Sequence, residues 1–223
     1  MVTTLLGKKL SMTQLWDDAG NVIPVTLIQA GPCHVVQVKA KDGKDGYGAI
    51  QLGYDELLPR NDGKGDVRAT KPMLGHFKRS GAKPCRVLRE VRLKKGETAP
   101  EAGTVLTVEE VFKDIKKVDV VGTSKGRGFQ GTIKRHNFQR GPKTHGSKNY
   151  REPGSIGNNT TPAHVIRGKR MPGHMGDVRR TARNLDVVKI EGEQNLIYVR
   201  GAVPGPRGGD VLVRSAKLPG KKK

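Results

Sequence analysis

The sequence predicts a mainly β fold that closes into a barrel, accompanied by short helices and one long, basic, irregular extension loop. Short runs rich in Val, Ile and Leu alternate with turn residues along most of the chain, which is typical of β-strands. Helical patterns are few, so parallel βαβ winding is disfavoured. So many strands with so little helix cover do not fit one flat sheet, whereas a closed or nearly closed barrel removes the exposed edges.

Eight strands are expected, and the turns between them favour antiparallel hairpins. Gly, Asp or Asn, which tight reversals need, occur at 18–21, 41–43 and 191–195. We expect these strands to build the barrel. They cover residues 22–30, 34–40, 47–54, 85–93, 118–121, 185–190, 196–200 and 210–215.

Two short helices are expected outside the strands. Thr107 and Glu110 stand three residues apart before an apolar run, which is the pattern of a capping box. A weaker helical pattern covers residues 74–79, inside a polar excursion at about 59–83. Residues 61–66 of that excursion, Asn-Asp-Gly-Lys-Gly-Asp, indicate a loop.

The charge balance of the chain points to a polyanionic partner. The 223 residues include 42 Lys and Arg against 21 Asp and Glu, which gives a formal net charge of +21 and a pI near 10.2. An excess of this size is typical of proteins that bind nucleic acid.

Several classes of protein are disfavoured by the sequence. No window approaches the ~18 consecutive apolar residues of a membrane span, and the first residues become charged too soon for a secretory signal. Cys33 and Cys85 stand alone, without the spacing of a zinc site or a disulfide framework. We therefore expect a soluble, cytoplasmic protein with free thiols, no metal and no cofactor.

Positive charge is concentrated in residues 122–183. These 62 residues hold fourteen Lys or Arg and only two acids, whereas the other 161 residues carry a net charge of +9. The segment lacks apolar periodicity and cannot build a core of its own. We therefore expect an RNA-threading extension at 122–183, inserted between a first barrel part at 1–121 and closing strands at 184–217. A basic tail follows at 218–223.

The run Gly126–Gly131 matches the pattern Gly-x-Gly-x-x-Gly, with Glu152 lying 21 residues beyond it. A dinucleotide fold places the pyrophosphate at the N-terminus of a helix that directly follows the glycines. The following run, Thr132–Pro142, lacks the small, helix-forming residues and the apolar stripe of such a helix. A nicotinamide-dependent enzyme is therefore a remote alternative, and we favour glycines that let backbone amides approach phosphates.

Cations on a glycine-hinged backbone suit the irregular surface of RNA better than a duplex groove. His and Phe side chains among these cations are able to stack on unpaired bases. The histidines have no acid and nucleophile at recognisable spacing, so we predict no catalytic residue. The predicted RNA-binding residues are Lys125, Gly126, Arg127, Gly128, Lys134, Arg135, His136, Arg140, Lys143, His145, Lys148, Arg151, Arg167, Lys169, Arg170, His174, Arg179 and Arg180.

An uncharged stretch at 153–162 separates the two basic arms and is the expected turning point. Each arm of about 30 residues spans several tens of ångströms at the extended limit of ~3.3 Å per residue. Ordering about 60 residues costs of order 100 kcal/mol of backbone entropy, so the arm is expected to be largely disordered without RNA. The predicted tip consists of Ser155, Ile156, Gly157, Asn158, Asn159 and Thr160.

Residues 112–135 resemble the signature of the large-subunit ribosomal protein L-three family. The residues that carry this similarity include Asp119, Gly122, Ser124, Lys125, Gly126, Arg127, Gly128, Gly131 and Arg135. The similarity covers nearly the whole chain, and the N-terminal segments fit the bacterial form of the family. It continues through residues 6–14, 24–26, 134–136, 141–142, 145–147, 151, 153–157, 169–176 and 201–205.

This resemblance implies a six-stranded antiparallel barrel of the translation-protein type. It also implies a structural, non-enzymatic constituent of the large ribosomal subunit that binds 23S-type rRNA near its 3′ end and supports early assembly. The family's long loop approaches the peptidyl-transferase centre, and the proteins L-fourteen and L-nineteen are among its neighbours. The chain is accordingly expected to reside in the ribosome.

Two positions at the tip have further implications through the resemblance. Asn159 matches the family's tip asparagine, where changes are associated with altered binding of peptidyl-transferase antibiotics. Many proteobacterial members carry a Gln that is methylated on its amide at the position of Thr160, and Thr160 cannot carry that modification. A ribosome-associated RNA chaperone or assembly factor is the alternative function.

Overall fold

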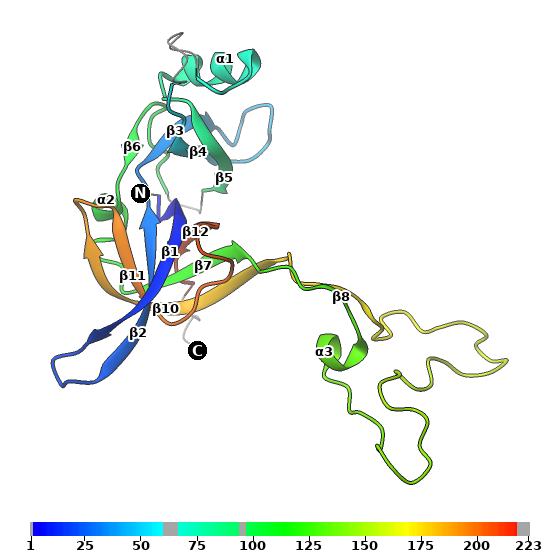
Figure 1. The fold of residues 1–223 in the computed structure, drawn as a ribbon. Coiled ribbons are helices and arrows are strands. Elements are labelled where there is room, and N and C mark those ends of the chain that lie inside the picture. Colours follow the sequence, from blue (N-terminus) through cyan, green and yellow to red (C-terminus); the bar gives the residue numbers. More distant parts are fainter. Residues whose placement is uncertain (1, 60–66, 94–96, 218–223) are drawn as a thin grey trace, which may run out of the picture. The chain divides into compact units, whose positions relative to one another are not determined.

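The computed structural model describes residues 2–59, 67–93 and 97–217 and contains two compact units (Figure 1). Residues Met1–Thr123 and Arg179–Lys223 form the first, here called the barrel unit, and Ser124–Val178 form the second, here called the extension. The predicted mainly β class with few short helices is confirmed. The expected loop at 61–66 and the basic tail at 218–223 lie outside the described residues.

Six antiparallel strands of the barrel unit pair in the order β1-β12-β7-β10-β11-β2, and β2 returns to β1 to close the barrel. Each strand therefore finds backbone partners on both sides. The strands are β1 (Thr4–Trp16), β2 (Val22–Ala30), β7 (Lys117–Thr123), β10 (Arg179–Glu191), β11 (Leu196–Arg200) and β12 (Asp210–Ser215).

Strand β1 was not among the eight expected strands, although it has two partners in the barrel. Lys8 and Lys9 interrupt its apolar pattern, yet Lys9 is buried and its Nζ donates to the carbonyl oxygens of Val203 and Gly205 at 2.8 and 3.2 Å. The ammonium group is thus satisfied by backbone acceptors inside the fold. The sequence pattern did not indicate β1 as a core strand, because the partners of the buried Lys9 lie far away in the sequence.

Strands at 34–40, 47–54 and 85–93 were expected in the barrel, and that assignment is wrong. They exist as β3 (Cys33–Lys39), β4 (Ala49–Glu56) and β5 (Cys85–Arg92), but they form a separate sheet in the order β5-β4-β3-β6. The fourth strand is β6 (Val105–Leu106). The cause is local pairing, because the turn after β3 lets β4 fold back on it, with Val38 opposite Ile50.

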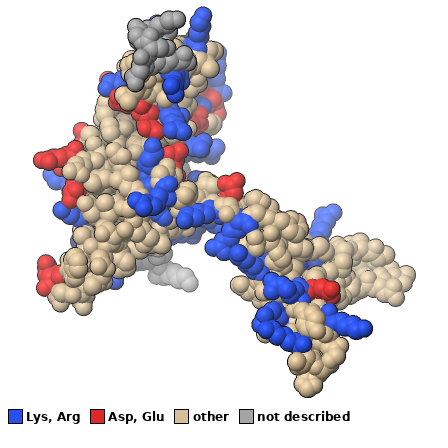
Figure 2. Space-filling view, in the orientation of Figure 1, with Lys and Arg blue, Asp and Glu red and all other residues tan. Residues whose placement is uncertain are grey.

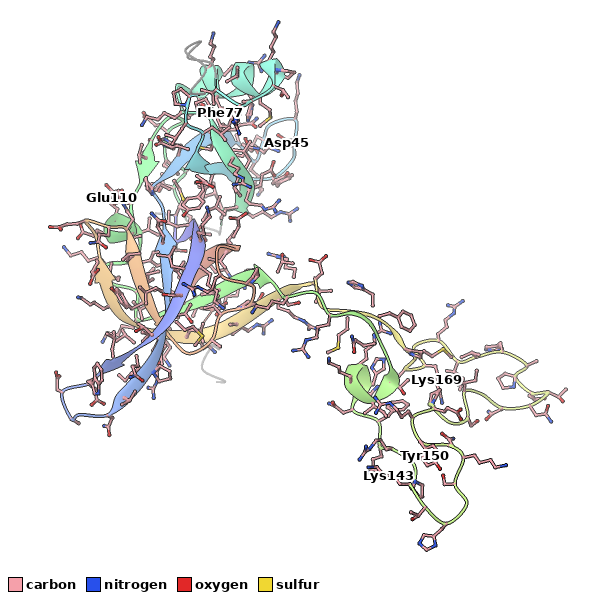
Figure 3. The ribbon with its side chains drawn as sticks, viewed as in Figure 1. Asp45, Phe77, Glu110, Lys143, Tyr150 and Lys169 are labelled. Carbon is pink, nitrogen blue, oxygen red and sulfur yellow. The ribbon has the colours of Figure 1, made fainter. Side chains whose placement is uncertain are left out.

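The small sheet contributes side chains to two hydrophobic clusters. Val35 points into the main core, which it shares with Leu5, Ile28 and Ile197 of the barrel strands. Its neighbour Val36 belongs to a second cluster that includes Phe77 of α1 (Lys71–Ser80). Figure 3 labels Phe77 on this helix. Successive side chains of a strand alternate between faces, so both clusters are served by one strand.

Both expected helices are present. Helix α2 (Val108–Phe112) starts with the expected capping box, in which the Thr107 backbone N–H donates to the Glu110 carboxylate at 3.2 Å. Helix α1 is longer than the expected 74–79 and ends at Gly81, whose φ of 67° suits a glycine cap. Among the described residues, no helix has the length and apolar character needed to cross a membrane.

Both cysteines are free and buried, as expected. Burial raises the pKa of the Cys33 thiol to about 12 and that of Cys85 to about 11. Neither thiol is therefore ionised at neutral pH, which makes both unreactive.

Candidate nucleic-acid interface

The extension begins and ends in a short paired stem. The Ser124 backbone N–H donates to the Val178 carbonyl at 2.9 Å, and the Asp177 N–H donates to the Ser124 carbonyl at 3.1 Å. Gly176 makes this approach possible, because a Cβ at that position would collide with the Lys125 carbonyl oxygen. Its φ of +78° is a second reason for glycine at this position.

Above the stem the two arms pair as a two-stranded ribbon, β8 (Gly128–Gln130) with β9 (Gly173–Met175). Phe129 lies directly opposite His174, and the Phe129 side chain is 75 % exposed. Two rings on one cross-strand pair offer a platform on which unpaired bases are able to stack. The predicted mixture of rings and cations is thus brought together by a ladder that the sequence pattern did not reveal.

Helix α3 (Thr132–His136) follows the ribbon and carries three basic residues in its only full turn. A guanidinium N–H of Arg135 donates to the Met171 carbonyl oxygen at 2.7 Å, and His136 Nε2 lies 3.0 Å from the same oxygen. A Cβ at Gly173 would lie 2.7 Å from the Arg135 guanidinium. The outgoing and returning arms are therefore joined at this point by a basic helix.

Beyond α3 the chain makes two open loops. The first is closed at its neck, where the Gly141 N–H donates to the Tyr150 carbonyl at 3.1 Å. The second includes the predicted tip, and every residue from 148 to 170 is exposed. The tip holds a local hydrogen bond, in which the Ser155 hydroxyl donates to the Gly157 carbonyl at 3.0 Å.

The extension has almost no interior. Thr132 is its one buried residue, and its side chains stand along an open trace in Figure 3. This confirms the expectation that the basic segment cannot build a core.

Cations of the extension are not neutralised within the described part of the chain. Its 55 residues hold eleven Lys and Arg against Glu152 and Asp177, and none of the eleven forms a salt bridge with a described residue. Figure 2 shows blue side chains gathered along this part of the molecule with little red among them. The field of these charges is therefore available to an external polyanion.

Sixteen of the eighteen predicted RNA-binding residues lie in the extension, and two do not. Arg179 and Arg180 were expected in the basic loop, but they belong to β10, where they pair with Thr123 and Gly122 of β7. Strand β10 was expected only from residue 185 and starts six residues earlier. The sequence pattern did not indicate a strand at 179–184, because the side chains of this polar run are exposed or only half-buried along the barrel wall.

The geometry does not support the dinucleotide interpretation of Gly126–Gly131. A helix does follow the glycines, contrary to the expectation from the sequence, but α3 has only five residues. It packs on no parallel sheet, because the sheet of the described extension consists of the antiparallel pair β8 and β9. A pyrophosphate site of the dinucleotide type needs both elements.

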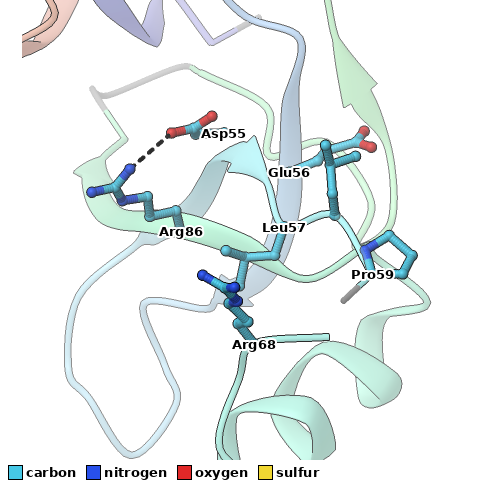
Figure 4. A pocket seen from close by; sticks show the side chains of 7 residues that line it. Asp55, Glu56, Leu57, Pro59, Arg68 and Arg86 are labelled. Atoms are coloured by element: carbon cyan, nitrogen blue, oxygen red, sulfur yellow. Dashed lines mark ion pairs between the residues drawn. The ribbon is translucent and has the colours of Figure 1, made fainter. Parts of the chain in front are cut away.

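A mixed-charge cavity of about 390 Å³ in the barrel unit is lined by Asp55, Glu56, Arg68 and Arg86 (Figure 4). Its carboxylates are occupied by cations: Lys8 Nζ lies 3.1 Å from Asp55, and Lys83 Nζ lies 3.0 Å from Glu56. Both acids are therefore held in ion pairs within the barrel unit, with Lys8 of β1 and with Lys83 just before β5.

Comparison with known proteins identifies close relatives over the full length. The family model described as ribosomal protein L3 matches residues 92–195. The large ribosomal subunit protein uL3 of Pelotomaculum thermopropionicum is 52 % identical, covering 95 % of this chain and 96 % of the relative. The uL3 proteins of Syntrophobacter fumaroxidans and Herpetosiphon aurantiacus are 47 % and 48 % identical, covering 96 % and 100 % of this chain and 97 % and 100 % of the relatives.

Proposed function

This chain belongs to the ribosomal protein L3 family, and from that membership we propose a specific role for its extension. The family is structural and non-enzymatic, so the chain is a constituent of the large ribosomal subunit. Within the subunit, the extension threads between helices of 23S-type rRNA near the 3′ end and neutralises their phosphates. The barrel, of the translation-protein type, anchors it.

The observation that carries this proposal is that the cations of the extension have no acidic partners among the described residues. Eleven Lys and Arg occur on a segment with a single buried residue, and none has a salt-bridge partner among the described residues. A folded protein rarely leaves so much like charge together, because the repulsion destabilises it unless a polyanion is bound. The stem, the β8–β9 ribbon and α3 present these charges along a defined path.

The tip at 155–160 is proposed to approach the peptidyl-transferase centre. Its lack of charge supports this, since the stretch 153–162 lies between the basic arms and contains no Lys, Arg, Asp or Glu. Asn159 is the tip residue through which antibiotic binding would be affected. Thr160 has no side-chain amide, so this chain has no methylated glutamine at that position. The proteins L-fourteen and L-nineteen are proposed as neighbours of the chain in the subunit. The chain is also proposed to support early assembly of the subunit.

The proposal is tested by the salt dependence of binding to a transcript of the 3′ domain of large-subunit RNA. Replacing Arg167, Lys169 and Arg170 with Gln removes three phosphate contacts, which lowers the slope of log K against log salt by about 2 to 3. The matched control replaces Lys41, Lys44 and Lys113, three exposed lysines of the barrel unit, and leaves the slope almost unchanged. Equal slopes for the two triple variants would contradict the proposal.

A second experiment separates an integral constituent from a chaperone or assembly factor. Large subunits are washed at about 0.5–1 M salt, where loosely held phosphate contacts weaken steeply, and are then sedimented in a sucrose gradient. The chain is expected to remain with the subunit in stoichiometric amount. Its release to the top of the gradient would favour the chaperone alternative.

A further inference from the structure

The barrel strands β1 and β2 continue past the barrel as a free two-stranded ribbon. Residues 4–8 of β1 pair with β12 and residues 25–29 of β2 pair with β11, whereas residues 11–16 pair only with β2 and residues 22–24 pair only with β1. We call residues 11–24 the hairpin ribbon; it is visible as the dark blue projection in Figure 1. In the described barrel unit, no strand other than β1 and β2 pairs with residues 14–16 or 22–23.

One face of the hairpin ribbon carries three exposed apolar side chains. Met12, Trp16 and Val22 have exposed fractions of 50 %, 65 % and 54 %. Trp16 lies opposite Val22, and Met12 lies on the same face because it is four residues from Trp16 along the strand. Leu15 and Ile23, on the other face, are only half exposed. These three apolar side chains share the face with Gln14 and Pro24, and exposed apolar groups gathered on one face are typical of an interaction surface.

The turn at the end of the ribbon is held in a defined conformation. Asp17 Oδ1 accepts hydrogen bonds from the backbone N–H groups of Ala19 and Asn21 at 3.1 and 2.7 Å, and Asp17 Oδ2 accepts one from the Asn21 side chain at 3.1 Å. The Asp17 N–H also donates to the Asn21 carbonyl at 3.0 Å. A preorganised turn fixes Trp16 beside it and reduces the entropy lost when a partner binds.

The hairpin ribbon differs in charge from the rest of the chain. Residues 10–38 form a run of 29 residues without a single Lys or Arg, in a chain that holds 42 of them. The ribbon itself carries Asp17 and Asp18, and Figure 2 shows red atoms at that end of the molecule. Arg200 lies opposite Val25, and Arg207 donates to the Leu10 carbonyl, both at the base of the ribbon. Hydrogen bonds from Asn21, and to a smaller extent the charge of Arg200, lower the pKa of the Asp17 carboxyl.

We propose that the hairpin ribbon is a docking site for a Lys- and Arg-rich segment of another protein. An arginine of that segment stacks on the Trp16 ring, aliphatic stems cover Met12 and Val22, and a further cation meets the Asp18 carboxylate. An RNA strand fits poorly, because both charged residues of the hairpin ribbon, Asp17 and Asp18, are acidic and would repel its phosphates. This site is independent of the extension and of its proposed RNA binding.

Site-specific photocrosslinking in intact subunits tests the docking site. Trp16 is replaced by p-benzoyl-phenylalanine in the full chain, large subunits are isolated and irradiated, and the adducts are mapped after nuclease and protease digestion. The matched control places the same probe at Thr13, which is exposed on the opposite face of the same strand. Recovery of each variant with the subunit is measured first, so that failure to enter the subunit is scored separately from failure to dock.

The expected adduct at position 16 joins a protein segment of net positive charge, and the probe at position 13 gives much less of it. Adding Asp18→Lys is expected to lower the yield about two- to tenfold, since one attractive exposed pair becomes repulsive, and Asp18→Asn is expected to lower it less. Asp18 suits this purpose because Asp17, not Asp18, holds the turn. An adduct with rRNA, a neutral or acidic peptide, equal yields at 13 and 16, or no adduct in well-incorporated subunits would each overturn the proposal.

Discussion

In the barrel unit, Lys39, Lys83 and Arg214 lie within 2.8 to 3.2 Å of carboxylate oxygens, whereas the eleven Lys and Arg of the extension have no carboxylate partner among the described residues. Apolar burial differs in the same way, because the barrel strands enclose a continuous core and the extension buries only Thr132. The same cationic side chains therefore stabilise the fold of one unit and remain available to an external partner in the other. The barrel folds by its own interactions, and the extension takes its order from what it binds.

The largest contrast is expected between two phenylalanines. Phe112 is fully buried in the main core, so Phe112→Ala lowers the free energy of unfolding by about 3 to 5 kcal/mol. Phe129 is 75 % exposed in the extension, and Phe129→Ala changes it by less than about 0.5 kcal/mol while weakening RNA binding. Chemical denaturation followed by circular dichroism measures the first effect, and filter binding measures the second. A similar loss of stability in both variants would contradict the comparison.

A partly buried ion pair, in which the acid is the buried partner, gives the next largest effect. Asp119 is 2 % exposed, accepts a hydrogen bond from Arg214 at 3.2 Å and caps the Asn184 N–H at 3.0 Å. Asp119→Ala leaves the guanidinium and the amide without their acceptor, and we expect a loss of about 3 kcal/mol in denaturation experiments. The control Glu152→Gln alters an exposed acid of the extension and is expected to leave stability unchanged. Equal losses would show that the extension's charges are also structural.

The stem of the extension is tested through Gly176. Gly176→Ala adds a Cβ that collides with the Lys125 carbonyl at a φ of +78°, a strain of about 1 to 3 kcal/mol. We expect weaker binding to the 3′-domain transcript and an unchanged melting temperature of the barrel. Gly131→Ala is the matched control, because its Cβ would meet no atom within 4 Å. A drop in melting temperature for Gly176→Ala alone would place the stem in the barrel's folding unit.

The smallest effect concerns Glu56 and pH. Hydrogen bonds from His34 at 2.8 Å and Lys83 at 3.0 Å hold the pKa of the Glu56 carboxyl below its ordinary value. A lowered pKa in the folded state stabilises the fold above the ordinary pKa of Glu, and this contribution is lost as the pH falls through the folded-state pKa. Glu56→Gln should therefore be less stable than the parent chain at pH 7, and the difference should shrink in acid. A constant difference from pH 7 to pH 3 would contradict this.

The sequence predicted the parts of the fold that depend on local patterns. The Thr107 capping box and the strands at 22–30, 196–200 and 210–215 are present because turn and cap residues act within a few positions of themselves. Strand β1 was missed because Lys9 finds its partners almost two hundred residues away, at Val203 and Gly205. Three strands were assigned to the wrong sheet for a related reason, since periodicity indicates a strand but not its neighbour.

The candidate interface was predictable in composition but not in geometry. Charge counting located the basic segment, since the segregation of fourteen cations needs no structure to be seen. The geometry depends on contacts between two arms that lie about 40 residues apart in the sequence, which local patterns do not indicate. These contacts place Phe129 opposite His174 and join Arg135 to the Met171 carbonyl. The hairpin ribbon was overlooked because an exposed Trp is recognised only when its surroundings are known.

Hydrogen–deuterium exchange tests most directly the claim that the barrel is self-sufficient and the extension is not. The free full-length chain is compared with the same chain in salt-washed large subunits, and exchange is followed for peptides of β7, β11 and residues 140–170. We predict strong protection of the barrel strands in both states, and protection of residues 140–170 only in the subunit. Protection of residues 140–170 in the free chain, at the level of the barrel strands, would contradict the account.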